Sequence, residues 1–473
     1  IINKPPLFMW LTAVSFKLFG INDFAVTFWH SIFALLTVMF TYQLAKEILD
    51  KKTALLSALI LLTSAQFFYQ ARSPLQDIPL TLFILLSIYT FVLYEKSGKL
   101  PYFYMSPVFV ALAVLTKGPV GLALPATILL IYIIMNKIKL PGVIHIILAS
   151  ILFMAIALPW FVAEYKILGQ RFLDVFIGHN IGRYFKPIDT IGSEATKYAP
   201  IKPQYDFYSY FLQIFILMIP WSGFVYPAIF YNLKKKTNNL PMIFALSVIL
   251  FFSFSLNYKI SRYILPALPA LSILIGKMFA GKEGAQNSPH LSMGNWLTIL
   301  LIAPVLIVAT ILLYLRFSNI SSYYLPLLLP FLVLLTSGLL FGSILGIIKK
   351  FDQSFIVLSV SSIIAYLLLI NSLSHNYLKL NPIGNFCKQI NAVAKPGDII
   401  CQYKGTDAHF MIYYSDSDVV FVRDKAKIKN LLLSGKKVYC ISGDQHAYRK
   451  LKSGLKGRIK ELDKSANYVL FSN

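Results

Sequence analysis

The sequence predicts an α-helical polytopic membrane protein with a small C-terminal α/β domain. Of its 473 residues, 57% are hydrophobic and 14% are charged, whereas soluble proteins carry about 25% charged residues. Apolar runs of about 20 residues, the length that crosses a bilayer as a helix, recur between residues 22 and 374. Residues 376–473 instead contain short segments typical of alternating strands and helices.

We expect about twelve membrane spans, with boundaries set by charged and turn-forming residues. The fourth and fifth spans meet at Lys117-Gly118-Pro119, and fusing them would invert the topology of everything that follows. The expected spans are residues 22–46, 53–70, 75–95, 101–116, 118–135, 141–163, 208–232, 240–256, 262–279, 294–316, 324–347 and 354–374.

The basic residues support this count and indicate its orientation. The formal net charge is +24, but the lysines and arginines form short clusters between apolar runs, which argues against nucleic acid as a partner and favours contact with the lipid bilayer. Short loops rich in Lys and Arg face the cytoplasm. In a twelve-span chain these loops alternate regularly, at residues 46–52, 96–99, 137–139, 234–236, 277–282 and 349–350.

This orientation places a long loop, residues 164–207, and the C-terminal domain on the external face. We expect a membrane domain over residues 1–375 and an α/β domain over residues 376–473. In the latter, "GDIICQY", "DVVFVRD", "KKVYCISG" and "ANYVLFSN" indicate strands, and "NPIGNFCKQINAVA" and "DQHAYRKLKSGL" indicate helices. Its cysteines, which could be structural or free thiols or form one disulfide, are Cys387, Cys401 and Cys440.

Two candidate functional stretches lie near the external ends of early spans. In "NKPPLFMWL", Lys4 precedes two prolines and an apolar helix; it is either an interfacial anchor or a functional cation. In "ARSPLQDIPLTLF", Asp77 lies close to the hydrocarbon region, where a carboxylate is costly unless it is paired or used. Arg72 is the partner that we expect for it, so an ion pair and a functional role are both open.

The long external loop contains a third candidate stretch, "GQRFLDVFIGHNIGRYFKP". His179 and Arg183 are four residues apart and share a helix face, either as a solvated pair or as part of a site. The spacing of the apolar residues predicts an amphipathic helix lying on the membrane. These apolar residues are Leu173, Phe176, Ile177, Ile181 and Tyr184.

A fourth stretch, "LNYKISRYILPALPAL", places Lys259, Arg262 and Tyr263 at the start of one span. Arg and Lys form charge-assisted hydrogen bonds with phosphate, and Tyr adds a hydroxyl. The alternative is an ordinary interfacial belt of aromatic and basic residues. Taken together, the four stretches predict an external cavity that suits an amphiphile with an anionic head and a long apolar tail.

These stretches resemble the GT-C glycosyltransferases of the protein O-mannosyltransferase and lipid A aminoarabinose transferase type. The resemblance covers roughly residues 4–275 in the order of the family. The segments that carry it are "KPPLFMWLTAVSFKLFGINDFAVTFWHSIFALL", "QDIPLTLFILL", "LTKGPVGLALP", "GHNIGRYF", "FLQIFILMIPW" and "YKISRYILPALPALSIL".

The resemblance implies a GT-C fold and a hexosyl- or pentosyltransferase in a bacterial inner membrane. Such an enzyme takes a sugar from a polyprenyl (undecaprenyl) phosphate carrier on the periplasmic face. Its acceptor is lipid A, lipopolysaccharide or a protein hydroxyl. The resemblance leaves open which sugar and acceptor are used and whether a divalent cation takes part.

The resemblance also suggests roles for individual residues. The donor phosphate would be clamped by Lys4, Arg183, Lys259 and Tyr263, while Asp77 would orient the sugar or the acceptor or support a metal. Further candidates are Arg72, Lys117, His179 and Arg262.

The family carries an acidic pair in the first external loop, upstream of its Lys-Pro-Pro motif. We therefore expect the catalytic base to lie before residue 1, so that the chain as given binds the donor without transferring its sugar.

Two other functions remain open at this point. An O-antigen ligase or lipid-linked glycan polymerase would use the same class of carrier, but with a polymer rather than a single sugar attached. A polytopic transporter should show internal repeats and ionisable residues near the bilayer midplane. In this sequence the charges gather at the ends of the spans and no repeat is visible, which disfavours a transporter.

Overall fold

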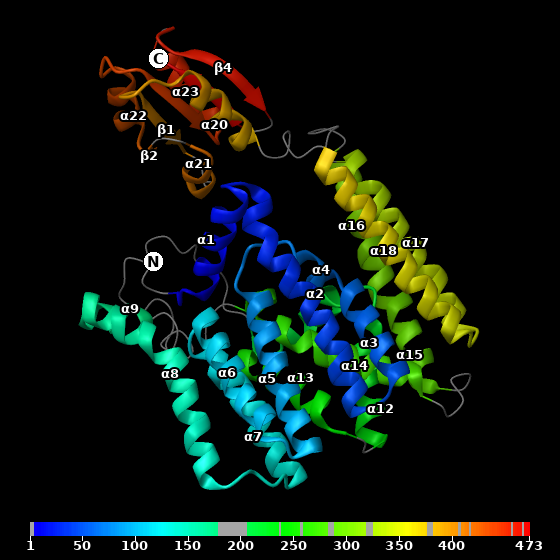
Figure 1. The fold of residues 1–473 in the computed structure, drawn as a ribbon. Helices are drawn as coiled ribbons and strands as arrows, with labels where there is room; N and C mark the ends of the chain where they lie inside the picture. The colour runs from blue at the N-terminus through cyan, green and yellow to red at the C-terminus, as the bar shows by residue number, and fades with distance from the viewer. Residues whose placement is uncertain are drawn as a thin grey trace. The chain divides into compact units, whose positions relative to one another are not determined.

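The structure, a computed structural model, describes residues 4–177, 206–235, 238–255, 259–281, 288–317, 325–375, 382–404, 408–415, 418–455, 457–465 and 468–473 (Figure 1). The chain divides into two compact units, Ile1–Ile320 with Leu332–Ala365 and Ser321–Phe331 with Tyr366–Asn473. The domain boundary that we predict at residue 376 stays a prediction.

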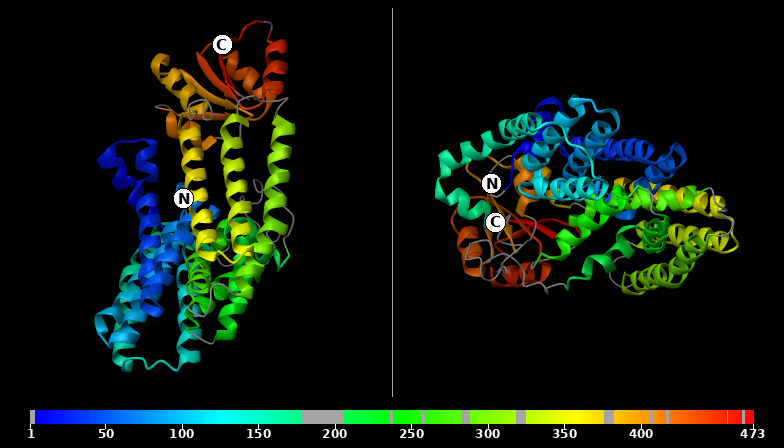
Figure 2. Two further views of the ribbon diagram at one scale, coloured as in Figure 1. Left: turned by 90° about the vertical axis from the view of Figure 1, so that its right-hand side faces the viewer. Right: turned by 90° about the horizontal axis from the view of Figure 1, so that it is seen from below.

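The first unit is a helical bundle whose longer helices run roughly alongside one another (Figure 2). Helices α17 and α18 each continue from one unit into the other. The helices are α1 (Leu7–Phe19), α2 (Asp23–Ile48), α3 (Lys51–Thr63), α4 (Ala65–Gln70), α5 (Asp77–Ser97), α6 (Leu100–Lys117), α7 (Val120–Asn136), α8 (Val143–Leu168), α9 (Gln170–Ile177), α11 (Ser209–Leu217), η4 (Ser222–Phe224), α12 (Val225–Lys235), α13 (Leu240–Ser253), η5 (Ser261–Ala267), α14 (Leu268–Ala280), α15 (Pro289–Leu297), η7 (Thr298–Ile302), α16 (Ala303–Phe317), α17 (Leu325–Ile347) and α18 (Phe351–His375).

The helices confirm a polytopic membrane fold. Within the described residues, eight helical segments are long and apolar enough to cross a bilayer, and α1, α7 and α13 are shorter apolar helices. Each of the expected spans coincides with one helix or with a short series of helices. The chain is therefore a multi-pass membrane protein.

The turn at Lys117-Gly118-Pro119 separates two helices, as the charge pattern predicts. Helix α6 ends at Lys117 and α7 begins at Val120. Gly118 adopts a positive φ of 75°, which a residue with a side chain rarely tolerates. At Gly121 a Cβ would lie 2.3 Å from the backbone of Ala113, so only glycine lets the two helices approach this closely.

Several expected spans are interrupted where proline or polar residues break the helical hydrogen bonds. Residues 53–70 form α3 and α4, separated at Ser64, and residues 208–232 form α11, η4 and α12. Pro266 lies within the 3₁₀-helical segment η5, which precedes α14, because proline disrupts the interior of an α-helix. Hydropathy finds the apolar run but not these breaks.

The second unit contains a five-stranded sheet in the order β2-β1-β3-β5-β4. Strands β2, β1 and β3 are parallel, whereas β5 is antiparallel to both β3 and β4. The strands are β1 (Ile399–Tyr403), β2 (Val419–Val422), β3 (Val438–Ser442), β4 (Lys460–Ser465) and β5 (Tyr468–Ser472), and the helices are α20 (Pro382–Val393), α21 (Ala408–Tyr414), α22 (Lys425–Leu432) and α23 (Gln445–Gly454).

Two apolar cores cover the two faces of this sheet. Helices α22 and α23 contribute Ile428, Leu432 and Leu451 to one core, and α20 and α21 contribute Phe386 and Met411 to the other. The four predicted strands and two predicted helices of this domain are confirmed. The sequence analysis missed β4 because "KELDKS" has no apolar alternation, and it also missed the short helices α21 and α22.

The cysteines separate into a pair and a single thiol. Cys401 and Cys440 are opposite each other on β1 and β3 and form a disulfide. Cys387, a residue of α20, is a free cysteine that this helix buries in the apolar core, and burial raises the pKa of its thiol to about 12. The disulfide that the sequence left open therefore joins the two strand cysteines.

Candidate functional site

A buried carboxylate and two cations meet at one end of the first unit. The Asp77 side chain faces the Lys117 ammonium, with 2.5 Å between Oδ1 and Nζ. Its other oxygen, Oδ2, lies 3.5 Å from Nε of Arg262. Asp77 and Lys117 are 3% and 7% exposed, so their ion pair is shielded from solvent. We refer to Asp77, Lys117, Arg262 and Tyr263 as the cationic cluster.

Three chain breaks position this cluster. Asp77 is the first residue of α5, where a carboxylate interacts favourably with the helix dipole. Lys117 is the last residue of α6, and the glycine turn after it places its side chain at the same end of the bundle. Arg262 and Tyr263 lie in η5, which packs against α5. Pro266, which interrupts this span, therefore lies in the same segment as Arg262 and Tyr263.

Tyr263 supplies an aromatic surface to the cluster. The Lys117 ammonium lies 4.6 Å from the centre of its ring, and the Arg262 guanidinium lies 5.9 Å from it. Tyr263 also contacts α13, because the centre of its ring lies 5.4 Å from that of the Phe252 ring. Tyr263 thus connects the cations to the end of α13.

Lys259 lies next to this cluster but points toward a helix end. Its ammonium donates hydrogen bonds to the carbonyls of Phe252 at 3.1 Å, Ser253 at 2.6 Å and Ser255. These carbonyls belong to the end of α13, where a cation complements the helix dipole. Lys259 is 4% exposed, and burial lowers the pKa of its ammonium. In this structure it therefore stabilises the C-terminal end of α13.

The charge balance of the cluster favours an anionic ligand. One carboxylate faces two cations, so Asp77, Lys117 and Arg262 together carry one excess positive charge. Arg262 is the accessible member, with a side chain that is 37% exposed. A guanidinium also presents several donors in a geometry that matches phosphate and carboxylate groups. The cluster can therefore bind an oxyanion through Arg262 while Asp77 holds the buried lysine.

The structure corrects one expected pairing. We predicted Arg72 as the partner of Asp77, but the ion pairs of Asp77 involve Lys117 and Arg262. Arg72 is exposed and lies 4.8 Å from the centre of the Phe68 ring. The two cations that replace it are 40 and 185 positions further along the chain than Asp77, so sequence proximity pointed to the wrong residue.

The remaining predicted residues are only partly described. Lys4 is half-buried just before α1. His179 and Arg183 lie outside the described residues, and so does most of the predicted amphipathic helix. Its beginning is described as α9, in which Phe172 and Phe176 are buried. Of the residues predicted to clamp the donor phosphate, the structure therefore describes Lys4, Lys259 and Tyr263.

The sequence analysis did not select His30, which is fully buried in α2. Its Nε2 donates a hydrogen bond to the carbonyl of Leu75 at 2.5 Å, and its ring packs edge-on against Phe8 with 4.5 Å between ring centres. Leu75 is two residues before Asp77, so His30 helps to position the chain that leads to the carboxylate. An ionisable residue inside an apolar span was the signal that could have identified it.

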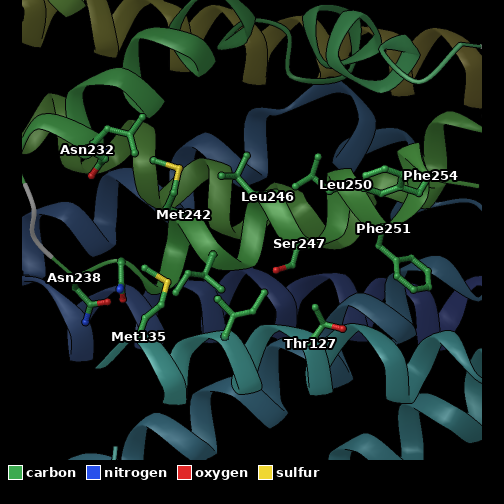
Figure 3. Close-up of a pocket in the computed structure, with 14 residues that line it drawn as sticks. Thr127, Met135, Asn232, Asn238, Met242, Leu246, Ser247, Leu250, Phe251 and Phe254 are labelled. Atoms are coloured by element: carbon green, nitrogen blue, oxygen red, sulfur yellow. The ribbon is translucent and has the colours of Figure 1, made fainter. Parts of the chain in front are cut away.

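An apolar cavity runs along α13, between this helix and α7 (Figure 3). Its volume is about 620 Å³. Phe251 and Phe254 lie at one end, which we refer to as the phenylalanine end, and Asn232 and Asn238 lie at the other (Figure 3). The lining residues are Thr127, Ile131, Met135, Asn232, Leu233, Asn238, Asn239, Met242, Ile243, Leu246, Ser247, Leu250, Phe251 and Phe254.

The phenylalanine end of this cavity borders the residues around the cationic cluster. Phe252, the neighbour of Phe251 in α13, contacts Tyr263, and Lys259 donates to the carbonyl of Phe252. A ligand with an anionic head and an apolar tail could therefore contact both features. Within the described residues, no group of three or more His, Cys, Asp or Glu side chains could hold a metal ion.

Known proteins are similar to this chain in sequence. Residues 3–162 match the family described as dolichyl-phosphate-mannose-protein mannosyltransferase. An uncharacterised protein of Aquifex aeolicus is 29% identical over 92% of this chain and 80% of its own length. The undecaprenyl phosphate-alpha-4-amino-4-deoxy-L-arabinose arabinosyl transferase 1 of Proteus mirabilis is 26% identical over 77% of this chain and 66% of its own length.

A solved structure shares the fold of the whole chain. The crystal structure of ArnT from Cupriavidus metallidurans bound to undecaprenyl phosphate matches with a TM-score of 0.76 and 17% identity, over 100% of this chain and 88% of that chain. The chain is a glycosyltransferase with the GT-C fold, and it is similar to the aminoarabinose transferases. The resemblance predicted from the sequence motifs is thus confirmed, as are the GT-C fold and the assignment as a glycosyltransferase.

The chain spans only part of the length of its named relatives. It spans 66% of the arabinosyl transferase of Proteus mirabilis and 48% of the corresponding protein of Wigglesworthia glossinidia brevipalpis. The cationic cluster of the GT-C chain involves residues of α5 and α6 inside the matched range 3–162 and residues of η5 beyond it.

Proposed function

We propose that this GT-C glycosyltransferase moves a sugar from a polyprenyl phosphate carrier, most simply undecaprenyl phosphate, to lipid A, lipopolysaccharide or a protein hydroxyl. The reaction takes place on the periplasmic face of a bacterial inner membrane, where the C-terminal α/β domain also lies. The observation that carries this proposal is the cationic cluster beside the phenylalanine end of the apolar cavity.

The donor phosphate binds at the accessible side of the cationic cluster. Arg262 contacts the phosphate oxygens through its guanidinium, and the Tyr263 hydroxyl is the second ligand on η5. Lys4 and Arg183 complete the clamp, as the sequence motifs predict, and Lys259 adds its positive charge from the end of α13, where backbone carbonyls hold its ammonium. The isoprenoid tail lies in the cavity along α13, so head and tail are bound by adjacent parts of the same bundle.

Catalysis follows from stabilisation of the leaving group. The acceptor hydroxyl oxygen forms a bond to the anomeric carbon, while the bond from that carbon to the phosphate oxygen breaks and its electron pair stays on the phosphate. The acceptor proton passes to a general base. Cations that hold the phosphate more tightly as its charge increases lower the barrier of this step.

Asp77 acts mainly by positioning the cations. Both of its oxygens are engaged, one by Lys117 and one by Arg262, so the carboxylate fixes where the two cations lie. A buried pair is costly to break because it leaves an uncompensated charge. This arrangement supports positioning of the cations over direct proton transfer, and orientation of the sugar by Asp77 stays a prediction from the sequence.

The comparisons support the choice of donor. Several relatives are named undecaprenyl phosphate-aminoarabinose arabinosyl transferases, and the crystal structure with the shared fold contains undecaprenyl phosphate. A pentose or aminopentose is therefore the first sugar to test, and lipid A is the first acceptor.

A reconstituted transfer assay tests the proposal. The protein expressed from its full-length open reading frame is reconstituted in liposomes and given either a monosaccharide on undecaprenyl phosphate or a polymer on undecaprenyl diphosphate, together with lipid A. We expect transfer from the monosaccharide carrier and loss of that transfer in Arg262→Ala. Transfer from the polymer carrier alone would instead identify an O-antigen ligase, and absence of binding to either carrier would contradict the proposed donor class.

A further inference from the structure

The cavity along α13 ends at a cluster of amide side chains. Asn136 donates a hydrogen bond to the side-chain oxygen of Asn239 at 3.0 Å. The side-chain oxygen of Asn238 accepts a hydrogen bond from the backbone N–H of Leu240, also at 3.0 Å. Asn232 and Asn238 lie together at this end of the cavity (Figure 3). We refer to Asn136, Asn232, Asn238 and Asn239 as the amide end.

Polar side chains line this end of the cavity. Asn238 and Asn239 are both among the lining residues and are only half-buried. Asn232 is more deeply buried: its Nδ2 donates to the carbonyls of Ala228 at 2.7 Å and Leu274 at 3.2 Å. A hydrocarbon chain cannot hydrogen-bond with the amides of Asn238 and Asn239, and covering them would cost free energy. The amide end therefore disfavours an apolar ligand that extends past it.

The distance between the two ends limits the length of chain that fits. Helix α13 has 14 residues and is therefore about 21 Å long. An extended isoprene unit adds roughly 4 to 5 Å, given ordinary carbon–carbon bond lengths. A tail that starts at the phenylalanine end thus reaches the amide end after about four or five units, well before the end of an undecaprenyl chain.

We propose that the amide end makes this cavity a length gauge for the lipid carrier. The cavity selects carriers by their first four or five isoprene units, and the units beyond them stay in the bilayer without adding affinity. This inference rests on the proposed function, since it takes polyprenyl phosphate as the ligand. The gain within the cavity comes from van der Waals packing, because the surrounding lipid is as apolar as the cavity wall.

Competition in nanodiscs tests the gauge. Polyprenyl phosphates of two to eleven isoprene units, each at a fixed mole fraction of the lipid, compete with radiolabelled undecaprenyl phosphate for the protein. We expect affinity to rise about tenfold, or about 1.4 kcal/mol, between two and five units. Between five and eleven units it should change less than about twofold, or about 0.4 kcal/mol.

We refer to the chain length above which the affinity stops rising as the break. Two variants should move the break in opposite directions. Ser247 lies between the two ends of the cavity (Figure 3), so Ser247→Phe should shift the break to two or three units. Asn238→Leu removes a half-buried amide that lines this end and should shift the break to longer chains. Leu130→Phe is the control, because Leu130 is 58% exposed on α7 and is not among the residues that line the cavity; it should leave the break at about five units.

The outcomes separate the gauge from the proposed function. A steady rise in affinity up to eleven units, equal affinity at every length, or a break that Ser247→Phe leaves in place would overturn the gauge while preserving the donor class. Failure of every polyprenyl phosphate to compete would contradict the donor class itself, and the gauge with it. A break at about five units that shifts as described supports both.

Discussion

Lys117 and Asp77 form a buried ion pair across 40 positions of sequence, with 2.5 Å between the ammonium and the carboxylate. The pair joins the end of α6 to the start of α5. Arg262 contacts the same carboxylate from η5, so three segments of the bundle depend on one acidic side chain. The stability and the chemistry of this region should therefore respond together to changes at Asp77.

Replacing either member of the pair should destabilise the protein. Asp77→Asn and Lys117→Met each leave the other group buried without compensation, and each should lower the free energy of unfolding by about 3–5 kcal/mol. The double variant should lose clearly less than the sum. Denaturant unfolding in detergent measures these values.

The exposed pair of Lys96 and Glu47 provides a matched control. Their side chains are 47% and 32% exposed, with 3.5 Å between the charged atoms. Removing either should change the free energy of unfolding by less than about 1 kcal/mol. Equal losses for the buried and the exposed pair would show that Asp77 and Lys117 are not coupled as described.

Arg262 should matter far more for sugar transfer than Arg72. Arg262→Lys keeps a charge but loses the planar guanidinium, so it and Arg262→Ala should both lower kcat/KM more than about tenfold, or about 1.4 kcal/mol of transition-state stabilisation. Arg72→Ala should stay within about threefold, because Arg72 is exposed and lies on Phe68. The reverse order would identify Arg72 as the phosphate ligand.

The buried amine of Lys259 predicts opposite pH responses of stability and binding. Burial lowers its pKa, so the folded state releases this proton at a lower pH than the unfolded chain does. Between the two pKa values the unfolded chain binds more protons, and this group's contribution to stability rises with pH. Binding of the donor phosphate should weaken over the same interval, since the cation is lost.

Lys259→Arg separates these effects, because arginine stays charged at every accessible pH. The affinity for undecaprenyl phosphate, measured from neutral to alkaline pH, should lose its decline in this variant. An identical decline in the wild type and in Lys259→Arg would assign the pH dependence to another group.

The thiols report on the C-terminal domain and on the compartment that it faces. Titration of the unfolded protein should find one thiol before reduction and three after it, because Cys401 and Cys440 are paired and Cys387 is free. In the folded protein Cys387 should not react near neutral pH, since burial raises its pKa to about 12 and the thiolate is the reactive form. Three thiols before reduction would argue against an oxidising, external location.

The orientation of the helices can be tested with single cysteines in two described turns. Gly98 lies between α5 and α6, and Pro74 lies just before α5; both are exposed. With the predicted topology, a cysteine at Pro74 should react with a membrane-impermeant reagent in intact spheroplasts. A cysteine at Gly98 should react only after lysis, and labelling of both from outside would exclude this topology.

The sequence predicts the membrane fold well because each span must be apolar over most of its length, whatever its neighbours are. It also predicts that Asp77 needs a partner, since a carboxylate near hydrocarbon is costly. It could not identify that partner. The pairing with Lys117 depends on the glycine turn that folds α7 back onto α6, and the pairing with Arg262 depends on how η5 packs against α5.

Other features also depend on tertiary packing. The cavity between α7 and α13 leaves no periodic signal, because its lining residues are as apolar as those that face lipid. Lys259 was expected to face a phosphate, and its hydrogen bonds to the end of α13 depend on the path of the chain after that helix. Strand β4 is polar throughout and forms by pairing with β5.

The most direct test of the central claim is a structure of the protein in a nanodisc with undecaprenyl phosphate, determined by electron cryomicroscopy. We expect phosphate density in contact with the Arg262 guanidinium and the Tyr263 hydroxyl, and tail density along α13 between Phe254 and Asn232. Phosphate density away from Arg262, with the cavity along α13 empty, would contradict the donor site described here.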